Sequence, residues 1–289
     1  MKLKWLLAVL TTGMSHEQAA SRKQDQYLAI CLVVKHQNED LREWVDYHVF
    51  MGVSKFYVFD DGGETDSAAG VLQDYIDSGL VYHENTETSM YGAQLKKYGL
   101  CIKRYADYHQ WLAFIDVDEF IVVDDPHRTA ADKLRNYEEY GGVGLNWLLY
   151  GSSGLDERPR GGVGNYYKCS RQTWENTHIK TIANTDHVRE QGGHAHSFVY
   201  KDGYFAVSVG KNRITQTPPT NIDPPDWDGW HLNHYILKSR TDFAKKVKRG
   251  GGSGGKWDRN WDFFKEIDAK MTGDWRLTAR RFVAGAGNS

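Results

Sequence analysis

The sequence is poor in cysteine and proline. Its three cysteines cannot build a disulfide framework, because their number is small and odd, and at most one pair can close. Cys31 and Cys101 lie on apolar faces and are expected to be core thiols, and none of the three has the spacing of a metal site. Four of the six prolines fall between residues 217 and 228, which predicts a loop there.

Neither sign of charge dominates the chain. Its 36 lysines and arginines face 38 aspartates and glutamates, which gives a net charge of −2. A dedicated nucleic-acid binder carries a basic patch or stripe, so we expect no nucleic-acid partner. Two phosphate-binding motifs are also missing: the P-loop, and a Gly-x-Gly-x-x-Gly turn after the first predicted strand.

Long hydrophobic runs are absent as well. A transmembrane helix needs about 20 apolar residues, and the apolar run at residues 5–10 is far shorter. That run follows the basic residues 1–4 in the order of a secretory signal, with a poor cleavage site at residues 19–21. A disordered start is the alternative. We therefore predict a leader over residues 1–26, with weak membrane association at most.

The composition that remains is that of a folded enzyme or binding protein. Hydrophobic residues make up 40% of the chain and charged residues 26%, which is typical of globular proteins. Aromatic residues reach 13% and suit flat, half-polar ligands as well as a core. Trp227 and Trp230 could each stack on such a ligand or belong to the core.

Apolar runs and helical patterns alternate through the first half of the chain. Such alternation predicts right-handed crossovers and an α/β fold, with a mostly parallel sheet flanked by helices. The second half is less regular and predicts an α+β arrangement. Strands are predicted at 27–34, 56–59, 80–82 and 111–115, and helices at 38–49, 66–76 and 95–105.

Weaker patterns describe the second half. Residues 141–164 are rich in glycine and predict loops with short strands, and residues 198–200 and 204–209 flank a turn and predict a hairpin. Helices are predicted over 235–248 and around 261–271. The glycine run at 250–255 between them predicts a flexible break.

Two aspartates follow the last predicted strand of the first half. Parallel sheets bind ligands beyond the carboxyl ends of their strands, where Asp116 and Asp118 lie. In an extended segment the two side chains point to one side, so together they could hold Mg²⁺ or Mn²⁺ with phosphate oxygens. An ordinary solvated strand end is the alternative.

Histidines and lysines of the second half could complete such a site. A histidine from His194-Ala195-His196 or His231-Leu232-Asn233-His234 could be a further metal ligand, or simply form hydrogen bonds. Helical spacing places Lys238, Lys245 and Arg249 near one face, where they could neutralise a diphosphate. A solvated basic face is the alternative.

Five blocks of the sequence form a recognisable set: 29–48, 52–61 and 111–120, which ends in Asp-Val-Asp-Glu-Phe, and later 180–196 and 234–250. Together they resemble glycosyltransferase family 92 and the related family-2-like transferases. The resemblance is dense over residues 27–123 and patchy afterwards.

The resemblance implies a GT-A type fold, a nucleotide-sugar donor and a divalent metal, usually Mn²⁺. Carried over by position, Asp116 and Asp118 would bind the metal, and His234 would approach it. Lys238 would approach the diphosphate of the donor. Lys35, Glu39, Asp60 and Asp61 would lie around the nucleotide.

We therefore predict a metal-dependent glycosyltransferase that moves a hexose to a hydroxyl of a glycan or another acceptor. An inverting enzyme needs a carboxylate base, for which Asp226, Asp228 and Glu175 are candidates. The alternatives are an inactive, carbohydrate-binding relative and, ranked last, a sugar nucleotidyltransferase.

The resemblance also predicts the organisation of the chain. Residues 27–289 would form one catalytic domain, with a nucleotide-sugar-binding half at 27–125 and an acceptor-binding half at 126–289. It implies the secretory pathway or Golgi, membrane-associated or luminal, with the cytoplasm as the alternative.

Overall fold

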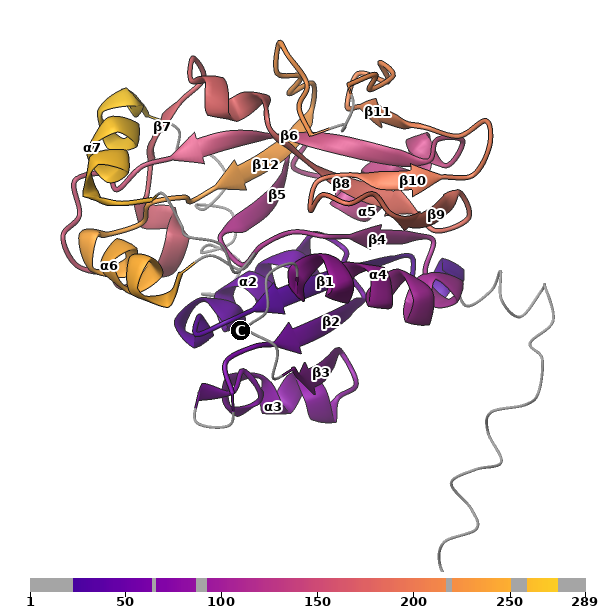
Figure 1. Ribbon diagram of the computed structural model, residues 1–289, viewed down its shortest axis with the longest axis horizontal. Helices are drawn as coiled ribbons and strands as arrows, with labels where there is room; N and C mark the ends of the chain where they lie inside the picture. Colours follow the sequence, from indigo (N-terminus) through magenta and orange to yellow (C-terminus); the bar gives the residue numbers. More distant parts are fainter. Residues whose placement is uncertain (1–22, 64–65, 87–92, 217–219, 251–258, 275–289) are drawn as a thin grey trace, which may run out of the picture.

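The structure is a computed structural model that describes residues 23–63, 66–86, 93–216, 220–250 and 259–274. Strands and helices alternate in its first half (Figure 1). The elements of this half are β1 (Leu28–Val34), α2 (Asn38–Phe50), β2 (Lys55–Asp60), α3 (Ala69–Asp77), β3 (Val81–Asn85), α4 (Ala93–Tyr105), the short 3-10 helix η2 (Ala106–Tyr108), β4 (Trp111–Ala113) and β5 (Glu119–Val123).

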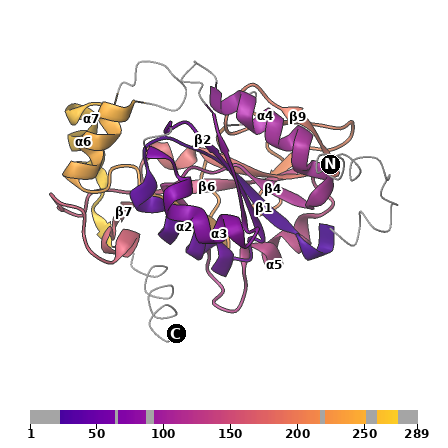
Figure 2. The same ribbon diagram turned by 90° about the horizontal axis from the view of Figure 1, so that it is seen from below.

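The strands of the first half form the predicted parallel sheet. β1 pairs in parallel with β2 and β4, and β2 pairs in parallel with β3. Because side chains alternate along a strand, Leu28 and Ile30 face one layer while Ala29 and Cys31 face the other. α2 and α3 pack on the first face and α4 on the second (Figure 2). The predicted α/β class with flanking helices is confirmed.

One cysteine prediction is wrong. Cys31 and Cys101 are not core thiols: they form a disulfide that joins β1 to α4. Both are fully buried, because α4 packs on the sheet face that carries Cys31 and brings the two Cα atoms to 6.5 Å. Cys169 remains a buried free thiol.

The second half extends the sheet with mixed pairings. Along the sheet the strand order is β13-β7-β6-β8-β4-β1-β2-β3, and β11 and β12 also pair with β6. The elements are α5 (Ala130–Leu134), η3 (Arg135–Tyr137), β6 (Gly142–Tyr150), η4 (Gly162–Asn165), β7 (Lys168–Ser170), η5 (Trp174–Thr177), β8 (Ile179–Asn184), β9 (Val188–Gln191), β10 (Phe198–Tyr200), β11 (Ala206–Ser208), β12 (Trp230–His234), α6 (Arg240–Arg249), α7 (Trp261–Lys270) and β13 (Gly273–Asp274).

The glycine-rich segment contains a long strand that the sequence analysis missed. β6 spans nine residues, all of them buried. Its glycines mark close packing: a Cβ on Gly142 would lie 2.5 Å from the Tyr200 hydroxyl oxygen, and one on Gly144 would lie 2.8 Å from Ile179 Cδ1. The glycines that predicted loops therefore let neighbouring side chains approach the centre of the sheet.

The predicted hairpin is also wrong. β10 pairs antiparallel with β9, while β11 pairs in parallel with β6. The two segments separate because Phe198 packs in the hydrophobic cluster under α4, whereas Val207 packs in the larger cluster on the other face.

The predicted helix at 235–248 starts too early. α6 begins at Arg240, and the Ser239 hydroxyl caps it by accepting a hydrogen bond from the Asp242 amide at 3.1 Å. Lys238 has φ +56°, which no helix accommodates. α7 confirms the last predicted helix, and residues 220–228 form the predicted loop. Residues 217–219 and most of the predicted flexible break lie outside the described residues.

One hydrophobic cluster joins the two halves, running from Tyr27 to Met271. The predicted leader is largely outside the described residues, but two of its last residues contact the fold: the Lys23 ammonium lies 2.6 Å from an Asp186 carboxylate oxygen, and the Gln26 carbonyl lies 2.7 Å from His109 Nδ1. Among the described residues, no helix has the length and apolar character that crossing a membrane requires.

Candidate active site

The turn between β4 and β5 carries the two predicted metal ligands. β4 lies at the centre of the sheet between β1 and β8, so the turn emerges where both halves meet. The Asp116 carboxylate accepts hydrogen bonds from Lys180 Nζ at 2.8 Å and from Gln94 Nε2 at 2.9 Å, and its side chain is 36% exposed. Lys180 comes from β8 and Gln94 from α4.

Asp118 is far more buried than Asp116. Lys246 Nζ, from α6, lies 2.5 Å from Asp118 Oδ2, and His234 Nε2, from the end of β12, lies 3.7 Å from the same oxygen. Burial raises the pKa of Asp118, but Lys246, His234 and Lys238 together lower it by more, so the pKa lies well below its ordinary value. Asp118 is therefore a buried, ionised carboxylate at neutral pH.

Burial also shifts the pKa values of the two partners of Asp118. Burial lowers the pKa of His234 to about 4 and that of Lys246 to about 8, although the negative charge of Asp118 opposes both changes. His234 is therefore neutral at pH 7. Its Nδ1 atom is buried and has no hydrogen-bond partner among the described residues.

Glu119 is a third carboxylate beside the pair. It is fully buried, which raises its pKa to about 8 even though Lys180 lowers it. One carboxylate oxygen accepts the Asp116 amide hydrogen at 2.8 Å, and the other has no partner within the described chain. Glu119 thus fixes the backbone of the turn.

The donor set at the turn fits a hard divalent cation only in part. The described residues bring no three His, Cys, Asp or Glu side chains into an arrangement that could hold a metal ion. Mg²⁺ and Mn²⁺ nevertheless need only one or two carboxylates when substrate phosphates supply the remaining oxygens. Asp118 and neutral His234 satisfy that requirement, provided that Lys246 is displaced.

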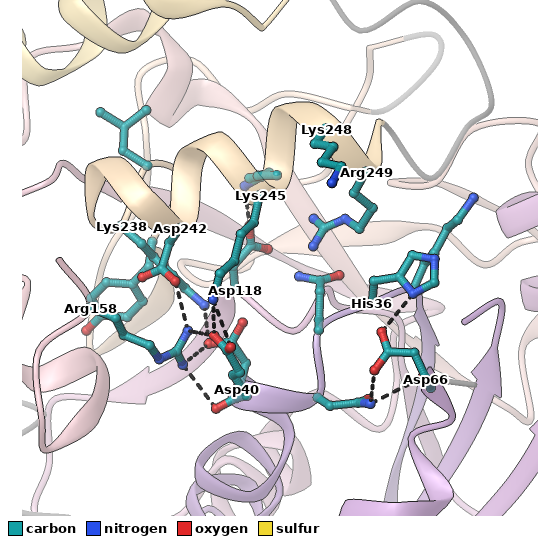
Figure 3. Close-up of a pocket in the computed structure, with 17 residues that line it drawn as sticks. His36, Asp40, Asp66, Asp118, Arg158, Lys238, Asp242, Lys245, Lys248 and Arg249 are labelled. Carbon is teal, nitrogen blue, oxygen red and sulfur yellow. Dashed lines mark hydrogen bonds and ion pairs between the residues drawn. The ribbon is translucent and has the colours of Figure 1, made fainter. Parts of the chain in front are cut away.

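A cavity of about 550 Å³ opens between α6 and the start of α2, and Asp118 lies on its wall (Figure 3). Seven basic and five acidic side chains line it. Of the predicted nucleotide and diphosphate ligands, Lys35, Glu39 and Lys238 are among them. The structure therefore places Lys35, Glu39 and Lys238 in one cavity with Asp118.

Three cations in this cavity have no carboxylate within ion-pair distance in the part of the chain that the structure describes. They are Lys35, which directly follows β1, and Lys248 and Arg249 at the end of α6 (Figure 3). Burial lowers the pKa of Arg249, against the attraction of Asp118. An anion in the cavity would supply the missing counter-charge.

Lys238 is instead held by an ion-pair cluster at one end of the cavity. Its ammonium lies 2.6 Å from Asp40 Oδ1, which also accepts a hydrogen bond from Arg158 at 2.5 Å. Arg158 lies 3.2 Å from Asp242 Oδ1. Burial raises the pKa of Asp40, but the two cations keep it below the ordinary value. The cluster joins the first turns of α2 and α6 (Figure 3).

Asp60 and Asp61 lie outside the cavity lining. Asp60 is buried and accepts backbone hydrogen bonds from Gly62 at 2.8 Å and Ala68 at 2.6 Å, so it shapes the loop after β2. Asp61 pairs with Lys97 at 3.2 Å. Asp66, which precedes Ala68, does line the cavity.

The three candidate bases lie away from the cavity lining. Asp226 and Asp228 line another cavity of about 580 Å³, where Asp226 accepts hydrogen bonds from Ser208 Oγ and the Gly210 amide. Glu175, in η5, pairs with Lys270 of α7 at 3.0 Å. Trp230 is fully buried and belongs to the core.

Comparisons with known proteins agree with this architecture. The family model "Glycosyltransferase family 92" matches residues 26–278. The chain belongs to glycosyltransferase family 92.

Relatives of this family 92 chain include a glycosyltransferase family 92 protein of Oryza sativa subsp. japonica, 27% identical over 197 residues that cover 67% of this chain and 33% of that protein. A galactan beta-1,4-galactosyltransferase of Arabidopsis thaliana is 39% identical over 108 residues, which cover 35% of this chain and 20% of that protein. The chain thus spans a third or less of these relatives. Among solved structures, HddC from Yersinia pseudotuberculosis aligns with 55% of this chain and 69% of its own chain, at a TM-score of 0.31 and 11% identity. This structural similarity is too low to bear on the fold.

The sequence analysis of the family 92 chain missed the partners of its carboxylates. Lys246 lies in the basic stretch of the sequence. The predicted shared face of Lys238, Lys245 and Arg249, however, required a helix that begins at Tyr235, whereas α6 begins at Arg240. Lys180 lies in a strand, and no local pattern connects it with Asp116. Such pairs arise only from strand order, because β8 inserts between β6 and β4.

Proposed function

We propose that this chain is a metal-dependent glycosyltransferase that transfers a hexose from a nucleotide-diphosphate sugar to a hydroxyl of a glycan acceptor. The observation that carries the proposal is Asp118, a buried and ionised carboxylate on the wall of a cavity in which Lys35, Lys248 and Arg249 have no carboxylate partner among the described residues. Departure of a nucleoside diphosphate leaves negative charge, and preorganised cations stabilise it.

In this proposal, different residues bind the diphosphate, hold the cation and accept the proton of the acceptor. Lys35, Lys248 and Arg249 would bind the diphosphate of the donor, and Asp118 with His234 would hold the cation, with Asp116 beside them. A bound Mn²⁺ or Mg²⁺ supplies Lewis-acid stabilisation of the diphosphate oxygens. Asp226, Asp228 and Glu175 remain the predicted candidates for the base that takes the acceptor proton.

The relatives suggest which substrates to test first. Galactan beta-1,4-galactosyltransferases are among them, so a galactose donor and a β-1,4-linked galactan acceptor are our first choice. The Cys31–Cys101 disulfide supports the secretory pathway over the cytoplasm, because disulfides persist in oxidising compartments.

One observation favours a second candidate, a catalytically inactive carbohydrate-binding relative. Lysine ammonium groups occupy both aspartates of the turn, Lys180 at 2.8 Å from Asp116 and Lys246 at 2.5 Å from Asp118. If these ion pairs are permanent, no cation can bind. The two candidates differ in whether the chain turns over a nucleotide-sugar at all.

The deciding experiment is a panel of nucleotide-sugars and hexose oligosaccharides, assayed for hydrolysis and transfer with Mn²⁺, with Mg²⁺ and with a chelator. We expect metal-dependent turnover, and we expect Asp118→Asn to reduce kcat/KM by at least about a hundredfold, since it removes charge at the leaving group. Asp202→Asn, in an exposed turn, is the matched control and should retain full activity.

The outcome separates the alternatives. Glycan binding without turnover of any donor would support the inactive relative. Full activity of Asp118→Asn, with a melting temperature equal to that of the wild type, would contradict the proposed role of Asp118. Release of pyrophosphate from a nucleoside triphosphate would instead indicate a nucleotidyltransferase.

A further inference from the structure

Trp174 is the most exposed large hydrophobic side chain of the described residues. It begins η5, and 66% of its surface is accessible to solvent. A single exposed hydrophobic residue is ordinary in itself. This one is noteworthy because its ring is the outermost member of a series that leads to Asp118.

We call this series the ring row: Trp174, His178, Trp147 and His234. The Trp174 and His178 rings meet edge-on at 4.9 Å, and the His178 ring stacks on Trp147 at 5.0 Å. Trp147 in turn contacts His234 at 4.3 Å. Since His234 Nε2 lies 3.7 Å from Asp118 Oδ2, the row runs from the surface to the candidate metal ligand.

The sheet fixes the inner half of the ring row. Trp147 lies in β6 and His234 in β12, and these strands pair in parallel with Leu232 opposite Trp147. Hydrogen bonds hold the outer half: the Trp147 amide donates to the His178 carbonyl at 2.9 Å. The buried rings of Trp147 and His234 therefore hold the half-buried His178 and the exposed Trp174 in a fixed arrangement.

Two polar atoms of the ring row have no partner among the described residues, one on the half-buried His178 and one on the buried Trp147. His178 Nδ1 lies 3.0 Å from the Glu175 carbonyl oxygen. A carbonyl can only accept, so Nδ1 carries the hydrogen of the neutral ring and Nε2 is left as an acceptor. No described residue bonds Nε2. The buried Trp147 Nε1–H likewise has no acceptor among the described residues, and unsatisfied buried donors are rare unless water or a ligand completes them.

The ring row differs in chemistry from the cation-lined cavity. None of its four rings lines that cavity, and the two share only the neighbourhood of Asp118. The cavity suits an anion. The row offers apolar faces with a few polar atoms, which suits the C–H face and hydroxyl edge of an uncharged pyranose ring.

We propose that the ring row is the acceptor subsite, where a pyranose ring of the acceptor glycan stacks on Trp174 and donates a hydroxyl hydrogen bond to His178 Nε2. This inference rests on the proposed function and adds the location of the acceptor. Glu175 acts in it as a positioning residue, because its backbone carbonyl fixes the orientation of the His178 ring.

The test compares Trp174→Ala and Trp174→Phe with wild type, using the donor and the oligosaccharide that the panel identifies, starting from β-1,4-galactotetraose. We expect Trp174→Ala to raise the acceptor KM on the order of tenfold, with the donor KM unchanged, because a stacking face is lost. Trp174→Phe retains a ring and should remain within about threefold of wild type. His178→Ala should raise the acceptor KM in the same way.

Phe50→Ala is the matched control, because Phe50 is 54% exposed but lies at the far end of α2. It should leave both KM values unchanged. Equal acceptor KM values for wild type and Trp174→Ala would overturn the acceptor subsite while leaving the proposed function intact. Wild-type chain that transfers to no oligosaccharide would contradict the proposed function, and the inference with it.

Discussion

At the β4–β5 turn and at Asp40 of α2, the two halves of the chain contribute opposite charges to the same ion pairs. The first half supplies the carboxylates Asp40, Asp116 and Asp118, from α2 and the β4–β5 turn. The second half supplies the cations that meet them, Lys180 and Lys246 among others. A buried carboxylate without a counter-charge costs several kcal/mol, so neither half provides a stable site alone. Three predictions compare the disulfide within the first half with the ion pairs between the halves.

The largest expected change in stability concerns the disulfide, which lies within the first half. The Cys31–Cys101 disulfide spans 70 residues, and a loop of that size restricts the unfolded chain enough to contribute about 4 kcal/mol to stability. We expect the double variant Cys31→Ala/Cys101→Ala to lose about that much free energy of unfolding. Denaturant unfolding with and without dithiothreitol measures it.

Cys169→Ala is the control, because this thiol is buried and unpaired. Its unfolding should respond to reductant as wild type does. If reductant leaves the melting temperature of wild type unchanged, the two cysteines are free thiols and the first half has no covalent tie.

The next effect concerns the contact between the halves. Lys246→Met removes the cation that pairs with Asp118 at 2.5 Å, and breaking a buried pair in this way should cost about 3 kcal/mol of stability in the presence of a chelator. Added Mn²⁺ should raise the melting temperature of this variant more than that of wild type, because the cation replaces the lost ammonium. Differential scanning fluorimetry across a Mn²⁺ titration would show it.

Lys248→Met serves as the control on the same helix, since Lys248 is exposed and has no carboxylate partner among the described residues. Its stability should match that of wild type. A Lys246→Met variant as stable as wild type, with no added response to Mn²⁺, would show that Asp118 needs no counter-charge from the second half.

The smallest effect concerns Glu119. Its folded pKa of about 8 lies above the ordinary value of 4.5, so the folded state retains a proton that the unfolded state releases between these pH values. This contribution to stability is complete below pH 4.5 and is lost as pH rises toward 8. Glu119→Gln has no such proton, so its stability relative to wild type should increase across that window.

Unfolding free energies of both proteins at pH 5, 6, 7 and 8 test this sign. A difference between the two proteins that stays constant with pH would mean that Glu119 is ionised in the folded state, held by Lys180. In that outcome the second half supplies the counter-charge for this carboxylate too.

Local patterns in the sequence were enough to predict most of the first half. Buried parallel strands appear as unbroken apolar runs, and each helix between them has one apolar face, so β1, β2 and β4 were found at nearly their observed positions. The placement of Asp118 at the strand ends followed from the same rule.

The second half was predicted less well because its elements depend on distant contacts. β6 contains glycines where Tyr200 and Ile179 pack against it, and no sequence pattern separates such glycines from those of a loop. The ring row could not be predicted for the same reason. Trp147, Trp174 and His178 come from separate elements, and their contacts exist only once β6, β8 and β12 are in place.

The pairing of Glu175 with Lys270 has a practical consequence for shortening the chain. Trp174 and Glu175 both lie in η5, and Lys270 of α7, 95 residues later in the sequence, donates a hydrogen bond to the Glu175 carboxylate. Asp268 of the same helix accepts a hydrogen bond from the Ser152 hydroxyl, just after β6. A version cut before Trp261 would keep the sheet strands from β1 to β12 and every carboxylate of the β4–β5 turn. It would lose the Lys270–Glu175 ion pair that holds η5, and with it Trp174, against α7. The shortest useful version therefore extends past Lys270.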